Sequence, residues 1–190
     1  MFEGSSGKIS KICKRGRTAQ FSPQSHKELG DAVMICIELS PVAHCSTGVH
    51  GPIEDWNVSG INDMHSLFSH ASSFNNAGIS KWDVSAVRDM TGMFSHTHLF
   101  NVDISEWDMS AVTDTSWMFY FAKVFNVDIS EWDVSRVSDM AAMFCNADAF
   151  NVNISKWDVS RANDMTNMFL KSASFKQVLS VSLVGVLVTF

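Results

Sequence analysis

The amino-acid sequence repeats itself at a nearly fixed interval. The segment FNVDISEWDMS at residues 100–110 returns as FNVDISEWDVS at 125–135 and as FNVNISKWDVS at 150–160, which gives a period of 25 residues. The step from Trp56 to Trp82 is 26 residues long, because one residue is added near Gly78. A fixed period of this size predicts structural units of one kind that stack on their neighbours.

The apolar spacing within one unit predicts short elements. Five units between residues 53 and 175 follow the pattern I-x-x-W-[DN]-[VM]-S, D-M-x-x-M-F and F-N, and neither a long helix nor a flat sheet fits it. The stretch 104–109 is similar to the strand signature of leucine-rich repeats, with Trp and Met inward and Asp outward, although a strand at 112–114 also fits. The stretch 118–125 predicts a helical or 3₁₀ turn. We therefore expect a leucine-rich-repeat-like solenoid, with short parallel strands on one side and 3₁₀ or helical turns on the other.

A helix is expected immediately before the repeats. Ser25 and Glu28 form a capping-box pattern, and the apolar residues that follow share one side of a helix up to about Leu39. Pro41 then stops it. A solenoid needs an end piece over its first coil, so we expect an N-terminal capping helix. The chain divides into a basic flexible arm (1–24), the capping helix and its lead-in (25–52), a five-coil solenoid (53–177) and an apolar C-terminal segment (178–190).

Charge and hydropathy limit the partners. The net charge of −6 combines +4 in residues 1–30 with −10 in the rest, which argues against a nucleic-acid groove along the repeats. The basic first residues lack a following apolar run, so no secretory signal is predicted. Residues 178–190 are apolar but shorter than the roughly 17–25 residues of a membrane span. They either cover the last coil or begin a longer anchor, and only the second alternative involves a membrane.

Positions that stay constant between coils are expected to stack on copies of themselves. For the Trp positions we favour interior packing over a carbohydrate platform. For the Asn positions we expect side chains that bond backbone groups at a bend. The Trp column is Trp56, Trp82, Trp107, Trp132 and Trp157, and the Asn column is Asn75, Asn101, Asn126 and Asn151.

Two Asp columns invite a chemical interpretation. Asp83, Asp108, Asp133 and Asp158 follow the Trp positions, and Asp63, Asp89, Asp114, Asp139 and Asp164 precede Met or Thr. We favour turn hydrogen bonds over calcium bridges or acid–base catalysis. These Asp residues recur in every coil, whereas the residues of an active site are expected to differ from the repeat pattern. His70 and His96 share one phase, with His98 nearby, but two His without a third fixed ligand make a weak zinc site. No catalytic, cofactor-binding or metal-ligating residue is predicted.

The third coil departs from the repeat in a way that suggests a contact surface. Trp117, Tyr120 and Phe121 occupy positions where other coils have mostly small or polar residues. Exposed aromatic clusters often mark binding sites, so these three residues are the candidate contact patch. The alternative, local repacking around Thr115, is equally compatible with the sequence.

The cysteines show no regular spacing. Cys13, Cys36, Cys45 and Cys145 form no C-x-x-C pair, and only Cys145 lies in the repeats. This arrangement argues against a disulfide framework and against a cysteine zinc site.

The motif W-D-V-S-x-V-x-D-M-x-x-M-F-x-x-A-x-x-F-N-x-D-I-S resembles the repeat of the BspA-type leucine-rich-repeat surface proteins over residues 53–175. The resemblance implies a right-handed solenoid with a cell-surface or extracellular adhesion role, and it implies no catalytic residues. We therefore expect a non-enzymatic module that needs no cofactor and binds a protein or cell-surface ligand. The alternative is a structural spacer that associates end to end.

Overall fold

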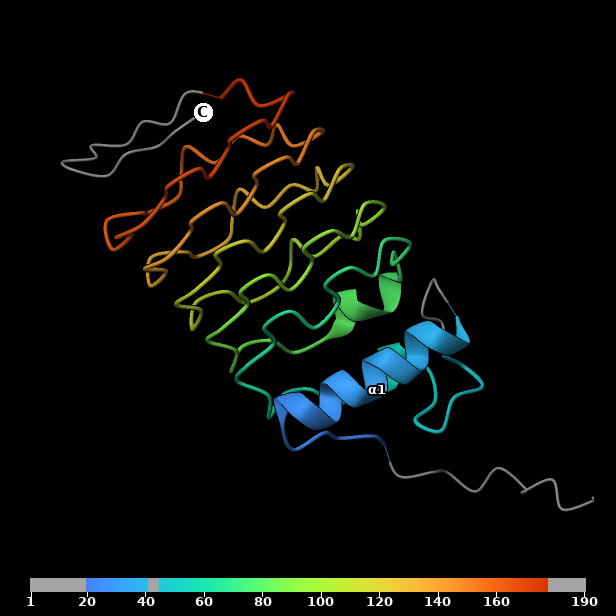
Figure 1. Cartoon of the computed structure of the whole chain (residues 1–190). Helices are drawn as coiled ribbons and strands as arrows, with labels where there is room; N and C mark the ends of the chain where they lie inside the picture. Colours follow the sequence, from blue (N-terminus) through green and yellow to red (C-terminus); the bar gives the residue numbers. More distant parts are fainter. Residues whose placement is uncertain (1–19, 41–44, 178–190) are drawn as a thin grey trace, which may run out of the picture.

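The computed structural model describes residues 20–40 and 45–177 and shows a stack of coils with a helix across one end (Figure 1). Helix α1 spans His26–Leu39, and two short 3₁₀ helices follow, η1 at Ile53–Asp55 and η2 at Ala77–Lys81. The coils follow one another in sequence order along the stack, so each unit contacts mainly the unit before it and the unit after it. In the described part of the chain, no helix is long and apolar enough to cross a membrane.

Helix α1 begins and ends at the residues that its sequence indicates. The Ser25 side chain accepts a hydrogen bond from the backbone N–H of Glu28, which is the expected N-cap. Leu29, Ala32 and Val33 are buried and belong to the same apolar core as the first coil. The helix therefore lies with its apolar side on the end of the stack, where it covers core residues that water would otherwise reach.

Each coil is a succession of turns closed by backbone hydrogen bonds between residues three apart. The N–H of Trp107 donates to the carbonyl of Ile104 at 3.1 Å, and the N–H of Val112 donates to that of Met109 at 2.9 Å. The same bonds recur at the equivalent positions of the other coils, for example from Trp132 to Ile129. Turns close a coil without extended segments, because each one reverses part of the chain direction.

Neighbouring coils are joined by hydrogen bonds from every second residue of the D-M-x-x-M-F segment. The N–H groups of one coil donate to carbonyl groups of the next at 2.8–2.9 Å between the first and second coils. The intervening N–H groups close turns within their own coil instead. The bonds between the first two coils run from Met64 to Asp89, from Ser66 to Thr91, from Phe68 to Met93 and from His70 to Ser95.

Two positions of every coil have a positive φ. The first has φ between 52° and 61° and the second between 58° and 64°. Each stands third in a turn, where type II turns require a positive φ and glycine is preferred. Only one of the ten is glycine. The first position is Ser66, Gly92, Trp117, Ala142 and Asn167, and the second is His70, His96, Phe121, Asn146 and Lys171.

This construction overturns the predicted leucine-rich-repeat-like solenoid with short parallel strands. The described residues contain no strand and no sheet, only isolated parallel bridges such as Asp89↔Asp114. The stretch 104–109 is turned rather than extended, and the bridges lie in the later segment, at the alternative position 112–114. The expected helical turn at 118–125 is also a series of hydrogen-bonded turns, whereas the 3₁₀ helices lie at 53–55 and 77–81. Because hydrogen-bonded turns recur through each coil, the described residues include no extended run long enough to form a strand.

Two columns of phenylalanine rings fill the interior. Ring centroids in successive coils lie 5.5–5.7 Å apart in the first column and 5.8–6.2 Å apart in the second. Within each coil the two rings stack at 3.8–4.0 Å. Stacked rings of this kind contribute about 0.5–1.5 kcal/mol a pair beyond their buried area. The first column holds Phe68, Phe94, Phe119, Phe144 and Phe169, and the second Phe74, Phe100, Phe125, Phe150 and Phe175.

A disulfide joins the helix to the segment before the first coil. Cys36 of α1 pairs with Cys45, with their Cα atoms 5.2 Å apart. The irregular cysteine spacing argued against a disulfide framework, yet one disulfide forms, because a helix and a following loop bring residues nine apart in sequence together. Cys145 is buried and has a free thiol.

The predicted flexible arm is partly in contact with the stack. Phe21 lies against the rings of His50 and Trp56, and its carbonyl accepts a hydrogen bond from the N–H of Asn57 at 2.9 Å. The rest of the arm, 1–19, and the predicted apolar C-terminal segment, 178–190, lie outside the described residues.

Candidate functional site

The three aromatic residues of the predicted contact patch lie together on the surface of the third coil. The Trp117 and Tyr120 ring centroids are 4.6 Å apart, and those of Tyr120 and Phe121 are also 4.6 Å apart. The Trp117 side chain is 45% exposed, while Tyr120 and Phe121 are half-buried. The sequence-predicted patch is thus one continuous set of ring contacts, with the largest ring most open to solvent.

Histidines of the first two coils extend this surface. The His70 and His96 rings stack at 4.4 Å, and the His96 and Phe121 rings stack at 4.9 Å. These residues hold one position of the repeat in three successive coils, so a single line of stacked rings runs along the coils. We call His70, His96, Trp117, Tyr120 and Phe121 the aromatic strip. Sequence reasoning noted the two histidines but did not join them to the aromatic residues, although their 25–26-residue spacing carried that signal.

The aromatic strip includes unfavourable backbone positions. Trp117 has φ of 61° and Phe121 has φ of 58°. Bulky residues rarely adopt this conformation, and it costs about 1–3 kcal/mol per residue, so such outliers cluster at functional sites. The second coil has Gly92 at the position of Trp117, with φ of 59°. Glycine therefore fits this turn without backbone strain, but the third coil has a tryptophan at the same position.

Ionisable side chains lie within and beside the aromatic strip. Partial burial and the nearby His70 and His98 together lower the pKa of His96 below its usual 6.5. The Ser95 hydroxyl lies 3.0 Å from Nδ1 of His96. At the other end, the Lys123 ammonium lies 4.7 Å from the centre of the Phe121 ring and 3.0 Å from a carboxylate oxygen of Asp148. The lowered pKa favours the neutral imidazole of His96, so this part of the strip is mainly aromatic in character.

The Trp column lies in the interior. Every member is at most 7% exposed, and each indole N–H donates to a backbone carbonyl at 2.9–3.2 Å. For Trp132 the acceptor is the carbonyl of Ile104 in the preceding coil. These indoles pack the core and join neighbouring coils, and they offer no surface for a sugar ring.

The Asn column lies at the surface and bonds backbone groups between coils. The side-chain oxygens of Asn75, Asn101 and Asn126 each accept from the backbone N–H of the Asn in the next coil at 2.9 Å. Asn151 ends the ladder by accepting from the N–H of Lys176 at 3.0 Å. Each amide thus satisfies a donor that the bend leaves without a partner within its own coil.

Both Asp columns are occupied by turn hydrogen bonds. A carboxylate oxygen of every member accepts from the backbone N–H two residues further along, at 3.0–3.1 Å in the column after Trp. In the column before Met or Thr the distances are 2.8–3.0 Å. The Ser135 hydrogen bonds hold the pKa of Asp133 below its usual value. In the half-buried column, desolvation, with repulsion from Asp114 and Asp164, raises the pKa of Asp139.

Comparison with known proteins places the repeat in one family. Two overlapping stretches of the chain, residues 38–137 and 103–183, match the family described as "Mycoplasma protein of unknown function, DUF285". The matches together cover well over half of the 190 residues and include all five coils. No curated protein and no solved structure matches the chain.

Proposed function

The chain belongs to the repeat family DUF285, and we propose that it is a non-enzymatic binding module whose aromatic strip holds a protein ligand. A stack of similar coils supports this role because it offers a long rigid surface on which single residues can vary. The resemblance of the repeat to BspA-type surface proteins supports a place for this surface on the outside of a cell. Both the likeness to BspA-type proteins and the location at the cell surface are therefore parts of this proposal.

One observation carries the proposal: Trp117 is exposed at a backbone position that disfavours it. An indole that is 45% exposed adds little to folding, and its φ of 61° costs stability. Tryptophan and tyrosine are the residues most enriched among binding hot spots. A residue that neither packs the core nor relaxes the backbone is best explained by contact with another molecule.

The arrangement of polar groups supports a role without catalysis. In all nine residues of the two Asp columns, a carboxylate oxygen already accepts a hydrogen bond within its own turn. General acid–base chemistry needs a carboxyl group directed at a substrate proton. These carboxylates stabilise the turns of the coils, and this structural role accounts for their presence in every coil.

The test uses a phage-displayed library of random peptides, selected on the immobilised full chain. Peptides enriched on the wild type should bind the Trp117→Gly variant about 30-fold more weakly, which is the effect of losing a hot spot of about 2 kcal/mol. Trp117→Gly copies the residue of the second coil and relieves the strained φ, so its melting temperature should equal or exceed that of the wild type. Val49→Ala, at a residue 82% exposed outside the repeats, is the control and should bind normally.

Two outcomes contradict the proposal. One is a selection without enriched peptides, and the other is enriched peptides that bind Trp117→Gly as tightly as the wild type. The alternative function, a structural spacer that associates end to end, predicts neither peptide binding nor any effect of Trp117. It predicts concentration-dependent oligomers in sedimentation velocity, and that result without peptide binding would favour the spacer.

A further inference from the structure

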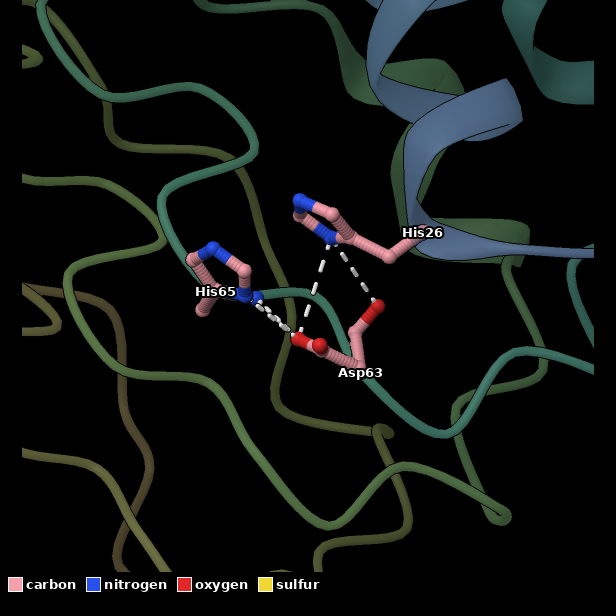
Figure 2. Close-up of side chains that lie close together, drawn as sticks. All are labelled: His26, Asp63 and His65. Carbon is pink, nitrogen blue, oxygen red and sulfur yellow. Dashed lines mark hydrogen bonds and ion pairs between the residues drawn. The ribbon is translucent and has the colours of Figure 1, made fainter.

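Three side chains from two elements meet where the helix crosses the first coil (Figure 2). His26 is the first residue of α1, and Asp63 and His65 belong to a turn of the first coil. One carboxylate oxygen of Asp63 lies 3.7 Å from Nδ1 of His26 and 2.8 Å from Nδ1 of His65. The two imidazole rings stack at 4.0 Å with an angle of 14° between their planes, and both present Nδ1 toward Asp63.

The repeat shows that His65 is not needed for the turn. In the other coils the same position is Thr91, Ser116, Ala141 and Thr166, and the backbone N–H of each bonds the preceding Asp at 2.8–2.9 Å. Ala141 has no side-chain donor, yet its turn has the same geometry. A histidine therefore interrupts the repeat only in the coil that faces His26, and the structure of the turn gives no reason for it.

We propose that His26, Asp63 and His65 bind a zinc ion. Two imidazole nitrogens and one carboxylate oxygen form a common zinc ligand set, with a water molecule in the fourth position. Zinc–ligand bonds of about 2.0–2.1 Å in a tetrahedral site place ligand atoms about 3.4 Å apart. The distances of 2.8 Å and 3.7 Å bracket this value, so small side-chain movements complete the site. Without metal, Nδ1 of His65 donates to the Asp63 carboxylate at 2.8 Å and Nδ1 of His26 faces the Asp63 backbone carbonyl at 3.3 Å. Zinc binding through Nδ1 therefore moves the proton of each neutral imidazole to Nε2.

The site is accessible and its ligands are held in place. The side chains of His26, Asp63 and His65 are 30%, 38% and 48% exposed, and the two histidines also line a groove of about 460 Å³ between α1 and the first coil. The backbone N–H of His65 donates to the ligating oxygen of Asp63 at 3.0 Å, which orients the carboxylate as outer hydrogen bonds do in metal sites. A bound zinc ion would join the helix to the first coil, and hence stabilise the end of the stack.

The experiment titrates zinc into the untagged, chelator-treated full chain, and follows competition with a chromophoric zinc indicator and the thermal melt. Each substitution takes a residue that the repeat already uses. His65→Thr copies Thr91 of the second coil and removes one ligand. The control His98→Ser copies Ser72 of the first coil and removes a histidine that lies outside both the zinc site and the groove. His26→Gln tests the helix ligand. All variants keep Cys13 and Cys145, so differences between them do not come from thiols.

In the wild type and in His98→Ser we expect one zinc ion per chain. Zinc at about 100 times the dissociation constant should raise the melting temperature by roughly 5–10 °C. His65→Thr and His26→Gln should bind at least about tenfold more weakly, because the loss of even an outer partner of a ligand costs this much. Calcium should not compete, since this set with two nitrogens suits zinc. Equal binding by His65→Thr and the wild type, or no stoichiometric binding by the wild type, would overturn the proposal.

Discussion

At the scale of single residues, the columns differ in what they contribute. Trp132 is 4% exposed and lies among the phenylalanine columns, whereas Asn126 is exposed and joins two coils through one hydrogen bond. Removal of a large buried side chain leaves a cavity as well as lost contacts, while an exposed amide can be replaced by water.

We therefore expect Trp132→Ala to lower the free energy of unfolding by about 3–5 kcal/mol. Asn126→Ala should lower it by about 0.5–1.5 kcal/mol, the net value of one hydrogen bond. Urea denaturation followed by circular dichroism measures both. Glu131→Ala is the control, because this exposed residue forms a surface ion pair with exposed Lys156 and should change stability by less than about 0.5 kcal/mol. Equal effects of the Trp and Asn substitutions would contradict the observed burial.

His96 gives a second prediction at this scale. Burial and repulsion from His70 and His98 depress its pKa, so between that value and 6.5 the unfolded chain binds more protons than the folded chain. The contribution of His96 to stability is then fully present above pH 6.5 and falls as the pH drops toward the folded-state pKa. Proton NMR should give His96 a pKa below 6.5, and His70→Asn should move it upward. A His96 pKa at or above 6.5 in the wild type contradicts this account.

At the scale of elements, α1 is held by three kinds of contact. Its apolar side packs on the first coil, its Ser25 cap fixes its start, and the Cys36–Cys45 disulfide fixes its last turns. The disulfide closes a short loop, so it limits the unfolded chain in proportion to the logarithm of that loop length.

Reduction of this disulfide should lower the free energy of unfolding by about 2–3 kcal/mol, the chain-entropy value for its nine-residue separation. Thermal melts with and without a phosphine reductant measure the change. The Cys36→Ala/Cys45→Ala double variant should melt at one temperature in both conditions. A reductant effect of the same size in this variant would assign the stabilisation to another thiol.

For the molecule as a whole, the stack depends on the alignment of equivalent positions in successive coils, which we call the phase of the repeat. Coils contact mainly their neighbours, and every interface uses the same backbone bonds and the same ring columns. In such arrays stability is roughly a sum of unit and interface terms, so one complete unit can be removed without loss of the remaining structure.

Deletion of residues 126–150 removes one 25-residue period and joins Phe125 to Asn151. We expect this variant to fold, to unfold cooperatively and to be modestly less stable than the wild type, because one interface is lost. Deletion of 126–149 removes one residue fewer and shifts the following units out of phase, so it should aggregate or melt without cooperativity. Circular dichroism and size-exclusion chromatography compare the two. Identical behaviour would show that phase does not control the stack.

Features that depend on local chemistry could be predicted from the sequence alone. The period, the unit boundaries, the helix from the Ser25 cap to Leu39 and the grouping of Trp117, Tyr120 and Phe121 could all be read from it. Each follows from residues close in sequence or from the period, which brings equivalent positions together whatever the path of the chain within a unit.

The path of the chain within a coil could not be predicted from the sequence, because it depends on contacts between coils. Strands were expected, but turns form, because nine of the ten left-handed positions carry residues other than glycine and give no local signal. The tertiary structure also brought His26 to Asp63, 37 residues away, and Cys36 to Cys45. These contacts depend on how α1 lies on the first coil. That placement results from burial of the apolar side of α1. The hydrophobic effect is non-directional, so it determines which face of the helix packs, while the geometry of the whole fold determines which atoms meet.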